Sequence, residues 1–523
     1  MVEPPLRTLP QVVQDAASRY GEQIAIADGP VQLDYRQLDQ ARRRSAAGFV
    51  AAGLTHGDRI AIWAPNIYQW IIAAIGAQSL GIVLVPINTR WKGSEAAYAL
   101  NKSRAKLLFS VGDFLGQSYP ELLAAEDLPH LQQIVMLQGK AANTLAWEDF
   151  LGAGESVTDT TVDQYAAQVT PDDILDIGFT SGTTGSPKGV VTNHGQNIRV
   201  FETWSATVGM RSDDVYLIVN PFFHSFGYKA GWLSAIIQGA RILPVLSFDL
   251  DTVLAQIERD RVTMLPGAPT IYQSILAHPK RKDYDLSSLR LAVTGAAPVP
   301  VELVNRMRNE LQFEVVVTAY GLTETCGVVT ICDADDPAEL ISATSGKAMA
   351  GVEVRIVDAD GNELPRGEAG EILVRGYNVM QKYLDDPQAT AEAITEDGWL
   401  KTGDVGVMDE SGYLDITDRI KDMFIVGGFN CYPAEIENML CSLDGVSQAA
   451  VIGMPDKRLG EVTCAFLIPG PGAELTEAGI ISWCREHMAN YKVPRAVYIV
   501  DSLPTNASGK VLKMELRQQV ASA

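Results

Sequence analysis

The sequence predicts an α/β protein with a large N-terminal domain of parallel α/β sheets, a small β-subdomain, and a small mobile α+β C-terminal domain. Between residues 60 and 320, short runs of Val, Ile and Leu alternate with helix-like segments, a pattern typical of parallel strands covered on both faces. After Gly346 the pattern changes to paired strands joined by a polar turn, and after Lys421 it changes again. A chain of 523 residues also exceeds what one hydrophobic core usually supports.

The large domain is expected to contain a series of buried parallel strands. Its most apolar long stretch, 70–87, is interrupted by Gln78, Ser79, Gly81 and Pro86. This stretch therefore predicts a helix followed by a core strand rather than a membrane span. The predicted strands are 60–63, 82–85, 215–219, 262–265, 291–293 and 315–318.

The smaller parts follow in chain order. Residues 352–357 and 371–375 flank a polar turn at 358–362 and predict antiparallel strands. We place the domain boundary after Asp418, which gives an N-terminal domain of residues 1–418 and a C-terminal domain of residues 419–523. The C-terminal domain is expected to hold a hairpin at 423–430, helices at 433–443 and 475–488, and strands at 449–452, 462–468 and 497–500.

The chain is acidic, with 64 acidic and 42 basic residues and a formal net charge of −22. This excess disfavours nucleic acid and anionic membranes as partners, and an anionic substrate then requires local positive groups. The N-terminus lacks a charged segment followed by an apolar one, so no signal peptide is expected. The cysteines form no C-x-x-C pair and the histidines do not cluster, which argues against zinc and predicts reduced thiols in the cytoplasm. They are Cys326, Cys332, Cys431, Cys441, Cys464 and Cys484.

The most informative segment is 176–190, where a buried strand leads into a loop of glycines and hydroxyl residues that ends at Lys188. Glycines allow backbone N–H groups to turn toward an anion, hydroxyls add donors, and the lysine adds a positive charge. The spacing Gly182-x-x-Gly185-x-x-Lys188 differs from that of a Walker loop. A Ser/Thr/Gly run by itself is more often a plain surface turn, but the strand before it and the lysine after it predict a phosphate loop.

This segment resembles the signature of the adenylate-forming superfamily, which includes acyl-CoA synthetases, beetle luciferases and the adenylation domains of peptide synthetases. Five further motifs occur in the order typical of that superfamily, so the resemblance covers nearly the whole chain. Each motif alone has a simpler interpretation as a turn, a surface ion pair or a solvated tail. The motifs lie at 220–229, at 294–297 with 318–325, at 399–404, at 418–421 and at 503–511.

The resemblance implies a nucleotide site and assigns its residues. Glu324 and Thr180 are implied as oxygen ligands of Mg²⁺, Thr323 as a contact of the α-phosphate, Asp404 as the ribose ligand with Arg419 beside it, and Lys510 as the adenylation lysine. His224, Thr323, Glu324 and Lys510 are the candidate catalytic residues. Further candidate nucleotide contacts are Ser181, Gly182, Thr183, Thr184, Lys188, Gly295, Ala296, Ala297, Tyr320 and Gly321.

The resemblance also implies the reaction, that of an AMP-forming acyl-CoA synthetase, a ligase. A carboxylic acid and MgATP give acyl-AMP and pyrophosphate, and the small domain then turns about Lys421 so that coenzyme A displaces AMP. Gly427 and Gly428 are implied to let the pantetheine arm pass. ATP, Mg²⁺ and coenzyme A are therefore the expected cofactors, the acid is the expected partner, and a homodimer is left open.

The sequence of the motif at 220–231 resembles that of a narrower group of enzymes. These are the actinobacterial ligases for the propionate side chain on steroid C/D rings, together with relatives that act on polycyclic terpenoid acids. For Lys229 two alternatives stay open, a contact to a ring oxygen of the substrate and an ion pair with a neighbouring carboxylate. Trp232 and Cys326 depart from that group. The candidate acyl-site residues are His224, Gly227, Tyr228, Lys229, Trp232 and Cys326.

Other functions remain open at this point. The enzyme could be a medium-chain fatty acid–CoA ligase, or it could make acyl-AMP for hand-over to another enzyme. A nucleotide-binding regulatory protein is a third alternative, against which the presence of Lys510 and Glu324 argues. No feature favours a luciferase-like oxidation.

Overall fold

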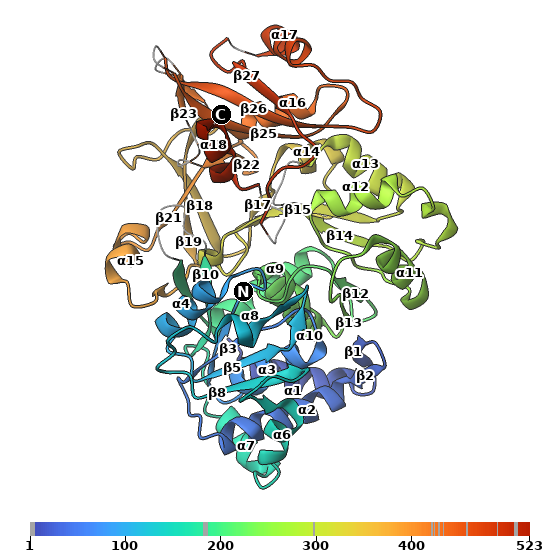
Figure 1. The fold of residues 1–523 in the computed structure, drawn as a ribbon, viewed down its shortest axis with the longest axis vertical. Helices are drawn as coiled ribbons and strands as arrows, with labels where there is room; N and C mark the ends of the chain where they lie inside the picture. Colours follow the sequence, from blue (N-terminus) through green and yellow to red (C-terminus); the bar gives the residue numbers. More distant parts are fainter. Residues whose placement is uncertain are drawn as a thin grey trace.

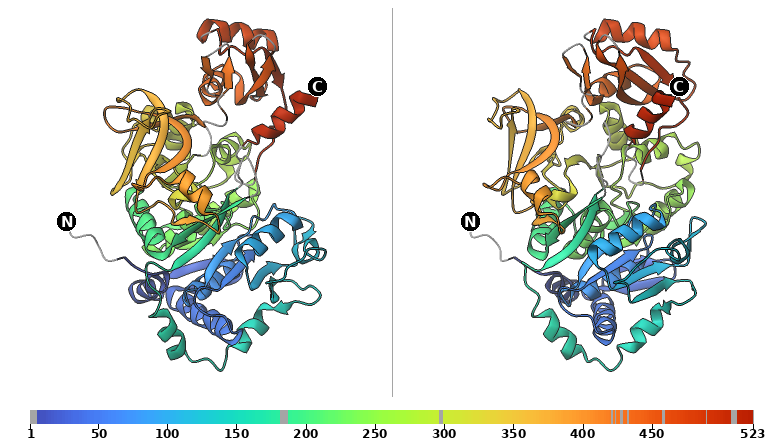
Figure 2. Two further views of the ribbon diagram at one scale, coloured as in Figure 1. Left: turned by 90° about the vertical axis from the view of Figure 1, so that its left-hand side faces the viewer. Right: turned by 60° about the vertical axis from the view of Figure 1, so that its left-hand side comes forward.

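A computed structural model describes residues 6–522, apart from 181–186, 296–298, 420–421, 423, 427–428, 432, 457–458, 489 and 507–510. Figure 1 shows a large N-terminal body, in blue to yellow, with the C-terminal elements in red at the opposite end of the long axis. The side views of Figure 2 show the C-terminal sheet and its helices as a separate small unit above that body. Among the described residues, no helix is both long and apolar enough to cross a membrane.

The first large sheet carries the phosphate-loop hairpin near one edge. Its central strands are parallel, whereas β11 runs antiparallel to β10 and β20 antiparallel to β11. Parallel strands buried on both faces explain the continuous Val, Ile and Leu runs. In spatial order the strands are β20 (Lys382–Tyr383), β11 (Lys188–Asn193), β10 (Ile174–Thr180), β4 (Val83–Pro86), β3 (Arg59–Trp63), β5 (Leu107–Val111), β8 (Gln133–Gln138) and β9 (Leu145–Ala146).

Two further sheets of four strands complete the α/β body. The predicted strand at 262–265 is wrong as a full strand, because only Met264 forms bridges there, one to Tyr216 and one to Leu291. Met264 thereby joins the two sheets edge to edge. One has the order β12 (Val215–Ile218), β13 (Arg241–Pro244), β1 (Ile24–Asp28) and β2 (Val31–Asp34), and the other β14 (Leu291–Thr294), β15 (Val315–Tyr320), β16 (Thr330–Ile331) and β17 (Lys347–Ala348).

Helices cover these sheets and share one extensive hydrophobic core with them. The stretch 70–87 contains most of one helix and a core strand, as predicted. A short hairpin, β6 (Asp113–Phe114) and β7 (Gln117–Ser118), lies outside the sheets. The helices are α1 (Leu9–Tyr20), α2 (Tyr35–Ala51), α3 (Tyr68–Gln78), α4 (Gly93–Ser103), α5 (Tyr119–Leu122), α6 (Trp147–Ala153), α7 (Asp159–Ala166), α8 (His194–Thr207), α9 (Ser225–Gly227), the π-helix η1 (Tyr228–Leu233), α10 (Ser234–Gln238), α11 (Leu250–Asp260), α12 (Pro269–Ala277), η2 (Arg281–Asp283), α13 (Val301–Glu310), η3 (Thr323–Thr325) and α14 (Ala338–Ala343).

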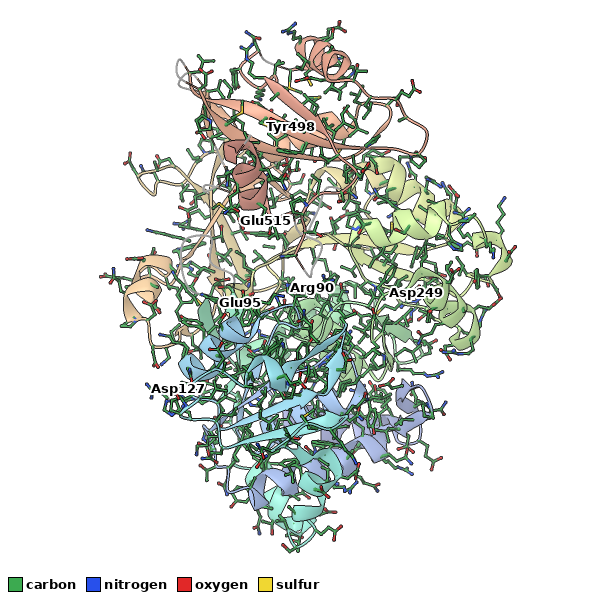
Figure 3. The ribbon with its side chains drawn as sticks, viewed as in Figure 1. Arg90, Glu95, Asp127, Asp249, Tyr498 and Glu515 are labelled. Carbon is green, nitrogen blue, oxygen red and sulfur yellow. The ribbon has the colours of Figure 1, made fainter. Side chains whose placement is uncertain are left out.

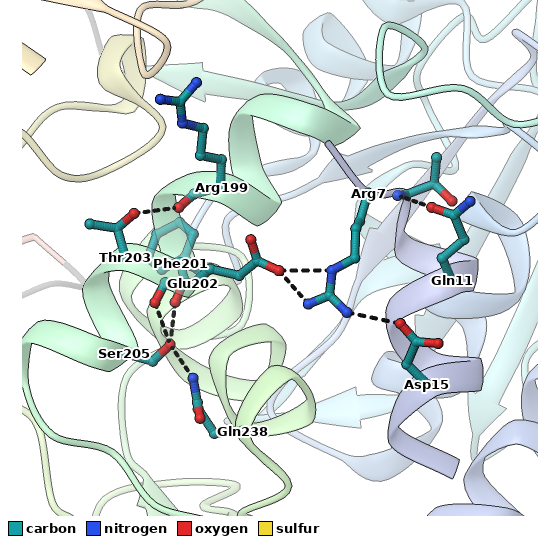
Figure 4. Close-up of polar contacts among 10 residues, drawn as sticks. Arg7, Gln11, Asp15, Arg199, Phe201, Glu202, Thr203, Ser205 and Gln238 are labelled. Atoms are coloured by element: carbon teal, nitrogen blue, oxygen red, sulfur yellow. Dashed lines mark hydrogen bonds and ion pairs between the residues drawn. The ribbon is translucent and has the colours of Figure 1, made fainter. Parts of the chain in front are cut away.

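The helix α8 directly follows the phosphate-loop hairpin and is anchored at both ends. At its start, Asn193 caps the helix by accepting a hydrogen bond from the backbone N–H of Gln196 at 2.8 Å, the usual role of Asn at such a position. Near its end, Glu202 accepts a hydrogen bond from Arg7 Nε at 2.8 Å, and Arg7 also donates to Asp15 of α1 at 3.0 Å. Figure 4 shows Arg7 between the two helices.

The β-subdomain is fully antiparallel, as predicted from the paired strands after Gly346. Its strands, in spatial order, are β18 (Val352–Val357), β19 (Ala369–Gly376), β21 (Leu400–Met408) and β22 (Leu414–Arg419), and α15 (Pro387–Ala393) lies between β20 and β21 in the chain.

The C-terminal elements enclose hydrophobic clusters of their own, separate from the main core. The predicted hairpin, helices and strands are all present, with shifts of a few residues at their ends. The domain boundary after Asp418 stays a prediction. The elements are β23 (Phe424–Val426), β24 (Phe429–Cys431), α16 (Pro433–Cys441), β25 (Val446–Asp456), β26 (Gly460–Pro469), α17 (Glu477–His487), β27 (Ala496–Ile499) and α18 (Lys513–Ser522).

Candidate active site

The phosphate-loop hairpin provides the base of the site. Six pairs of residues hold β10 against β11, and the last pair before the loop is Thr180 with Lys188. The Thr180 hydroxyl donates to the Lys188 carbonyl at 3.4 Å, and the Lys188 side chain is exposed. The strand pairing therefore keeps the two ends of the loop adjacent and leaves the lysine open to an anion.

Lys188, Tyr383 and Glu324 come together from three distant segments. The Lys188 Nζ atom lies 4.8 Å from the centroid of the Tyr383 ring, within the range of a cation–π contact. The Tyr383 hydroxyl donates to Glu324 Oε1 at 2.9 Å, and burial together with the charge of Glu324 raises the pKa of Tyr383. Tyr383 therefore remains a neutral donor that orients the carboxylate beside the cation.

The residues here suit magnesium better than a metal held by protein ligands alone. No group of three or more His, Cys, Asp or Glu side chains in the described part of the chain is arranged to hold a metal ion. Mg²⁺ usually takes one or two protein carboxylates and completes its shell with phosphate oxygens and water. Glu324 supplies such a carboxylate near the phosphate loop, and Thr180 lies at the start of the same loop.

A second polar pair, Tyr320 and Asp404, joins the α/β body to the β-subdomain. The Tyr320 hydroxyl donates to Asp404 Oδ2 at 2.6 Å, and Asp404 is 3% exposed. In the sheet register Asp404 lies opposite Arg419. Next to Tyr320, Gly321 has no space for a side chain, since an added Cβ would lie 2.2 Å from the Gly327 carbonyl oxygen. The candidate ribose ligand is thus held beside the candidate adenine contact.

Two further strand ends approach this region. Gly295 follows the carboxyl end of β14 directly, and an added Cβ there would lie 3.3 Å from the carbonyl oxygen of Ala319 in β15. Thr323 begins η3 and lies close to Gly178 of β10, where an added Cβ would meet the threonine methyl group at 3.0 Å. Both motifs thus begin at the carboxyl ends of strands β14 and β15, the edge where open α/β sheets bind ligands.

His224 is the predicted acyl-site residue whose side chain is exposed. Its Nδ1 accepts a hydrogen bond from the backbone N–H of Phe226 at 3.2 Å, which caps α9. Surrounding protein atoms disfavour a charged imidazole and lower the pKa of His224. A neutral ring with Nδ1 engaged in this way carries its proton on Nε2.

The other acyl-site candidates are enclosed by protein, and their role as substrate contacts stays a prediction. Trp232 and Cys326 are 0% exposed and Tyr228 is 2% exposed. Tyr228 and Trp232 stack with ring centroids 4.7 Å apart, and Trp70 packs against both. Burial raises the pKa of the Cys326 thiol to about 12. Gly227 is buried as well.

Of the two alternatives left open for Lys229, the structure contains the ion pair. Its Nζ lies 3.1 Å from both carboxylate oxygens of Asp176, and both residues are buried. Because Asp176 already neutralises the buried Lys229, a contact between Lys229 and a ring oxygen of the substrate is no longer expected.

Several predicted residues lie outside the described residues, and their roles remain predictions. For Arg419 the structure describes the backbone but not the side chain. The others are Ser181, Gly182, Thr183, Thr184, Ala296, Ala297, Lys421, Gly427, Gly428 and Lys510.

Three residues in or near the site were not predicted from the sequence. Asp176 had a visible signal, because a carboxylate within an apolar strand must find a partner. Tyr383 had none, since its two-residue strand pairs with β11 from far along the chain. Arg90 is an exposed cation that follows the carboxyl end of β4, the neighbour of β10, and Figure 3 labels it near the centre of the molecule.

Together these features define a nucleotide-binding α/β enzyme with a phosphate loop and a second, smaller C-terminal unit. The model of the AMP-binding enzyme family matches residues 13–384, and that of the AMP-binding enzyme C-terminal domain matches residues 435–510. The chain belongs to the AMP-binding enzyme family. The predicted superfamily and its use of ATP, Mg²⁺ and coenzyme A are thereby confirmed.

Named relatives and solved structures match along the whole chain. A 7a-methyl-1,5-dioxo-octahydro-1H-inden-4-yl propanoyl:CoA ligase of Rhodococcus jostii (strain RHA1) is 49% identical, covering 99% of this chain and 100% of the relative. The ligase of the same name from Mycobacterium tuberculosis is 47% identical, covering 98% and 99%. A crystal structure of an anthranilate CoA ligase with anthranoyl-AMP superposes with a TM-score of 0.89 at 26% identity, covering 100% and 99%. ATP-bound MatB from Rhodopseudomonas palustris does so with 0.86 at 28%, covering 98% and 99%.

Proposed function

We propose that the protein is an ATP-dependent acid–CoA ligase whose substrate is a carboxylic acid with a fused-ring, steroid- or terpenoid-derived body. The observation that carries this proposal is similarity along the whole chain, at 49% and 47% identity, to two ligases named for the CoA thioester of a dioxo-octahydroindenyl propanoate. Medium-chain acyl-CoA ligases of vertebrates are more distant, at 32% identity. The fused-ring acid is therefore favoured over a linear one.

In the first step a carboxylate oxygen of the acid attacks the α-phosphorus of ATP, and the bond to pyrophosphate breaks. Two anions must approach each other, so fixed positive charge and oriented donors lower the barrier. Lys188 supplies charge at the phosphate loop, and Tyr383 holds Glu324 in place by its hydrogen bond. Mg²⁺, when bound, neutralises phosphate charge. Lys510 is proposed to act on the same developing charge.

The nucleoside half of ATP is assigned to the second polar pair. Asp404 accepts a hydrogen bond from Tyr320, and a carboxylate is well suited to accept ribose hydroxyls. Gly295, Gly321 and the Tyr320 ring are assigned to the adenine.

In the second step the thiol sulfur of coenzyme A attacks the acyl carbon, and the bond between that carbon and the AMP oxygen breaks. We assign this step to a rotated position of the C-terminal domain, residues 419–523, turning about Lys421. Gly427 and Gly428 are proposed to let the pantetheine arm pass close to the backbone.

We assign the enzyme to the cytoplasm. Its six cysteines are all free thiols in the structure, and five of them are buried. Unpaired cysteines are typical of proteins from reducing compartments.

Acid-dependent exchange of pyrophosphate into ATP tests the first step, and formation of an acyl-CoA in the presence of coenzyme A tests the second. The panel should contain dioxo-octahydroindenyl propanoate, ferulate, octanoate and palmitate. The proposal expects both activities, with the fused-ring acid as the best substrate. Exchange without thioester formation would instead favour hand-over of acyl-AMP to another enzyme.

A further inference from the structure

A buried polar cluster lies at the phosphate-loop hairpin, where Asp176 of β10 pairs with Thr192 of β11, and has no part in the chemistry described above. It consists of Asp176, Thr192, Asn197 and Lys229, which are 2%, 1%, 0% and 5% exposed. The four side chains come from β10, β11, α8 and η1. The cluster therefore ties both strands of the hairpin to the two helical segments that pack beside it.

The contacts within the cluster form one connected network. The Thr192 hydroxyl donates to Asp176 Oδ1 at 2.6 Å, and Lys229 Nζ donates to the same oxygen at 3.1 Å and to Thr192 Oγ1 at 3.3 Å. Asn197 Nδ2 donates to Thr192 Oγ1 at 2.9 Å and to the carbonyl of Asn193 at 2.8 Å. Lys229 is the single cation in this network, and it reaches both strands of the hairpin.

On its other side Lys229 belongs to the segment that carries His224. The backbone N–H groups of Gly227 and Tyr228 both donate to the His224 carbonyl, at 3.0 and 2.9 Å. The segment also turns tightly, because an added Cβ at Gly227 would lie 2.3 Å from the carbonyl oxygens of Asn220 and Pro221. A shift of Lys229 would therefore be transmitted to His224.

Stability alone does not account for this pair. Removing two charges from water costs several kcal/mol per ion in proteins, and apolar side chains of similar volume often stabilise a fold equally well or better. A buried charge pair is better explained by a role in specifying one arrangement of two structural elements. Here the elements are the phosphate-loop hairpin, β10 with β11, and the helical segment that follows His224, which is kinked at Gly231.

We propose that Asp176 and Lys229 are positioning residues for adenylation, which hold the segment 224–233 in register with the phosphate-loop hairpin. The pair thereby sets where the acid lies relative to the α-phosphorus of ATP. This inference rests on the proposed ligase function, because it concerns how the acid and ATP are aligned in that reaction.

The test compares single and double variants in pyrophosphate exchange, with dioxo-octahydroindenyl propanoate as the acid. Lys229→Met and Asp176→Asn each leave one polar partner uncompensated, so each should lower the Tm. The double variant Lys229→Met/Asp176→Asn removes both charges and should recover most of the lost Tm. Its kcat/KM for the acid should stay about 10²-fold below that of the wild type, the loss expected when a reacting group is displaced by about 1 Å.

ATP binding separates positioning from a general structural effect. The Kd for ATP, measured without acid, should change little in the double variant, because the pairing of β10 with β11 holds the ends of the loop. If the double variant recovers both Tm and kcat/KM for the acid, the pair is only structural and the proposal is wrong.

A milder change guards against variants that fail to fold. Thr192→Val keeps the size of the side chain and removes the hydroxyl that orients Asp176. We expect it to fold and to lose about tenfold in kcat/KM for the acid, the effect of about one hydrogen bond. An unchanged value would also overturn the proposal.

The chain offers a matched control in the largely buried pair Arg290 and Asp214. Arg290 Nη2 lies 2.5 Å from Asp214 Oδ2, with side chains 11% and 2% exposed. These residues precede β14 and β12, at the strand ends opposite the site. Arg290→Met/Asp214→Asn should therefore change the Tm without separating the acid from ATP. A wild type without exchange on any acid of the panel would refute the proposed function, whereas an active wild type with unaffected cluster variants refutes only the positioning role.

Discussion

At the scale of single residues, the site depends on polar groups whose orientation is fixed by one neighbour. Tyr383 orients Glu324, and Tyr320 orients Asp404. The carboxylates were foreseen because they stand in sequence motifs. The two tyrosine contacts were not, because they join segments that are far apart in the chain and no local pattern encodes such a contact.

Tyr383→Phe tests the role of the hydroxyl group that holds Glu324. The change keeps the ring beneath Lys188 and removes one hydrogen bond to a charged group, a bond typically worth about 1.5–3 kcal/mol. We expect kcat/KM for adenylation to fall about tenfold or more, and the Mg²⁺ concentration for half-maximal rate to rise. The control is Tyr413→Phe, because Tyr413 makes the same kind of bond to Asp336 at 2.7 Å outside the site. Equal effects of the two changes would contradict the assignment of Glu324.

His194 makes the stability of the fold depend on pH. The ring is 0% exposed and its Nδ1 accepts a hydrogen bond from the backbone N–H of Leu9 at 3.1 Å, and burial lowers the pKa of His194 to about 3. Above pH about 6.5 neither the folded nor the unfolded state binds a proton at this residue. As the pH falls from there toward 3, the unfolded state binds one more proton than the folded state. The free energy of unfolding should therefore fall by up to about 1.4 kcal/mol per pH unit.

Urea titrations of the wild type and of His194→Gln between pH 7 and pH 4.5 measure this dependence. Glutamine does not titrate, so the variant should be less stable at pH 7 but lose less stability on acidification. Identical slopes for the two proteins would show that other groups cause the acid sensitivity.

At the scale of elements, local patterns predicted several strands of the large domain, among them β3, β4, β12, β14 and β15, and most of the C-terminal elements, but not helix α18. The segment 262–265 is hydrogen-bonded to Val215 on one side and to Leu291 on the other, but only Met264 forms bridges there, so it is not a regular strand. The strand β20 was not expected at all, since two residues carry no periodicity. Burial of the acyl-site candidates was also missed, because the sequence does not reveal which face of η1 packs against α3.

The anchor of α8 gives a prediction at this scale. Arg7 is 26% exposed and bonds both Glu202 and Asp15, so Arg7→Met should lower the free energy of unfolding by about 1 kcal/mol after allowance for solvent screening. The control is Arg36→Met, which removes the exposed pair of Arg36 with Glu22 and should have a smaller effect. Urea titrations at one pH compare the two. A larger loss for the control would contradict the assignment of Arg7 as an anchor.

At the scale of the whole molecule, we propose that the two-step reaction uses two arrangements of the C-terminal domain. Lys421→Pro should fix the backbone φ at the proposed hinge and impede rotation while leaving the first step possible. We expect a burst of acyl-AMP followed by slow transfer to coenzyme A in rapid-quench measurements. A normal overall rate would place the hinge elsewhere.

The central claim is that this AMP-binding enzyme makes the CoA thioester of a fused-ring propanoate. The most direct measurement is a competition in which dioxo-octahydroindenyl propanoate and octanoate are present together with ATP, Mg²⁺ and coenzyme A, and both thioesters are quantified. Their ratio gives the ratio of the two kcat/KM values. We expect the fused-ring thioester to predominate by about tenfold or more, the discrimination available from about 1–3 kcal/mol of differential binding. An equal or greater yield of octanoyl-CoA would contradict the claim and identify the protein as a fatty acid–CoA ligase.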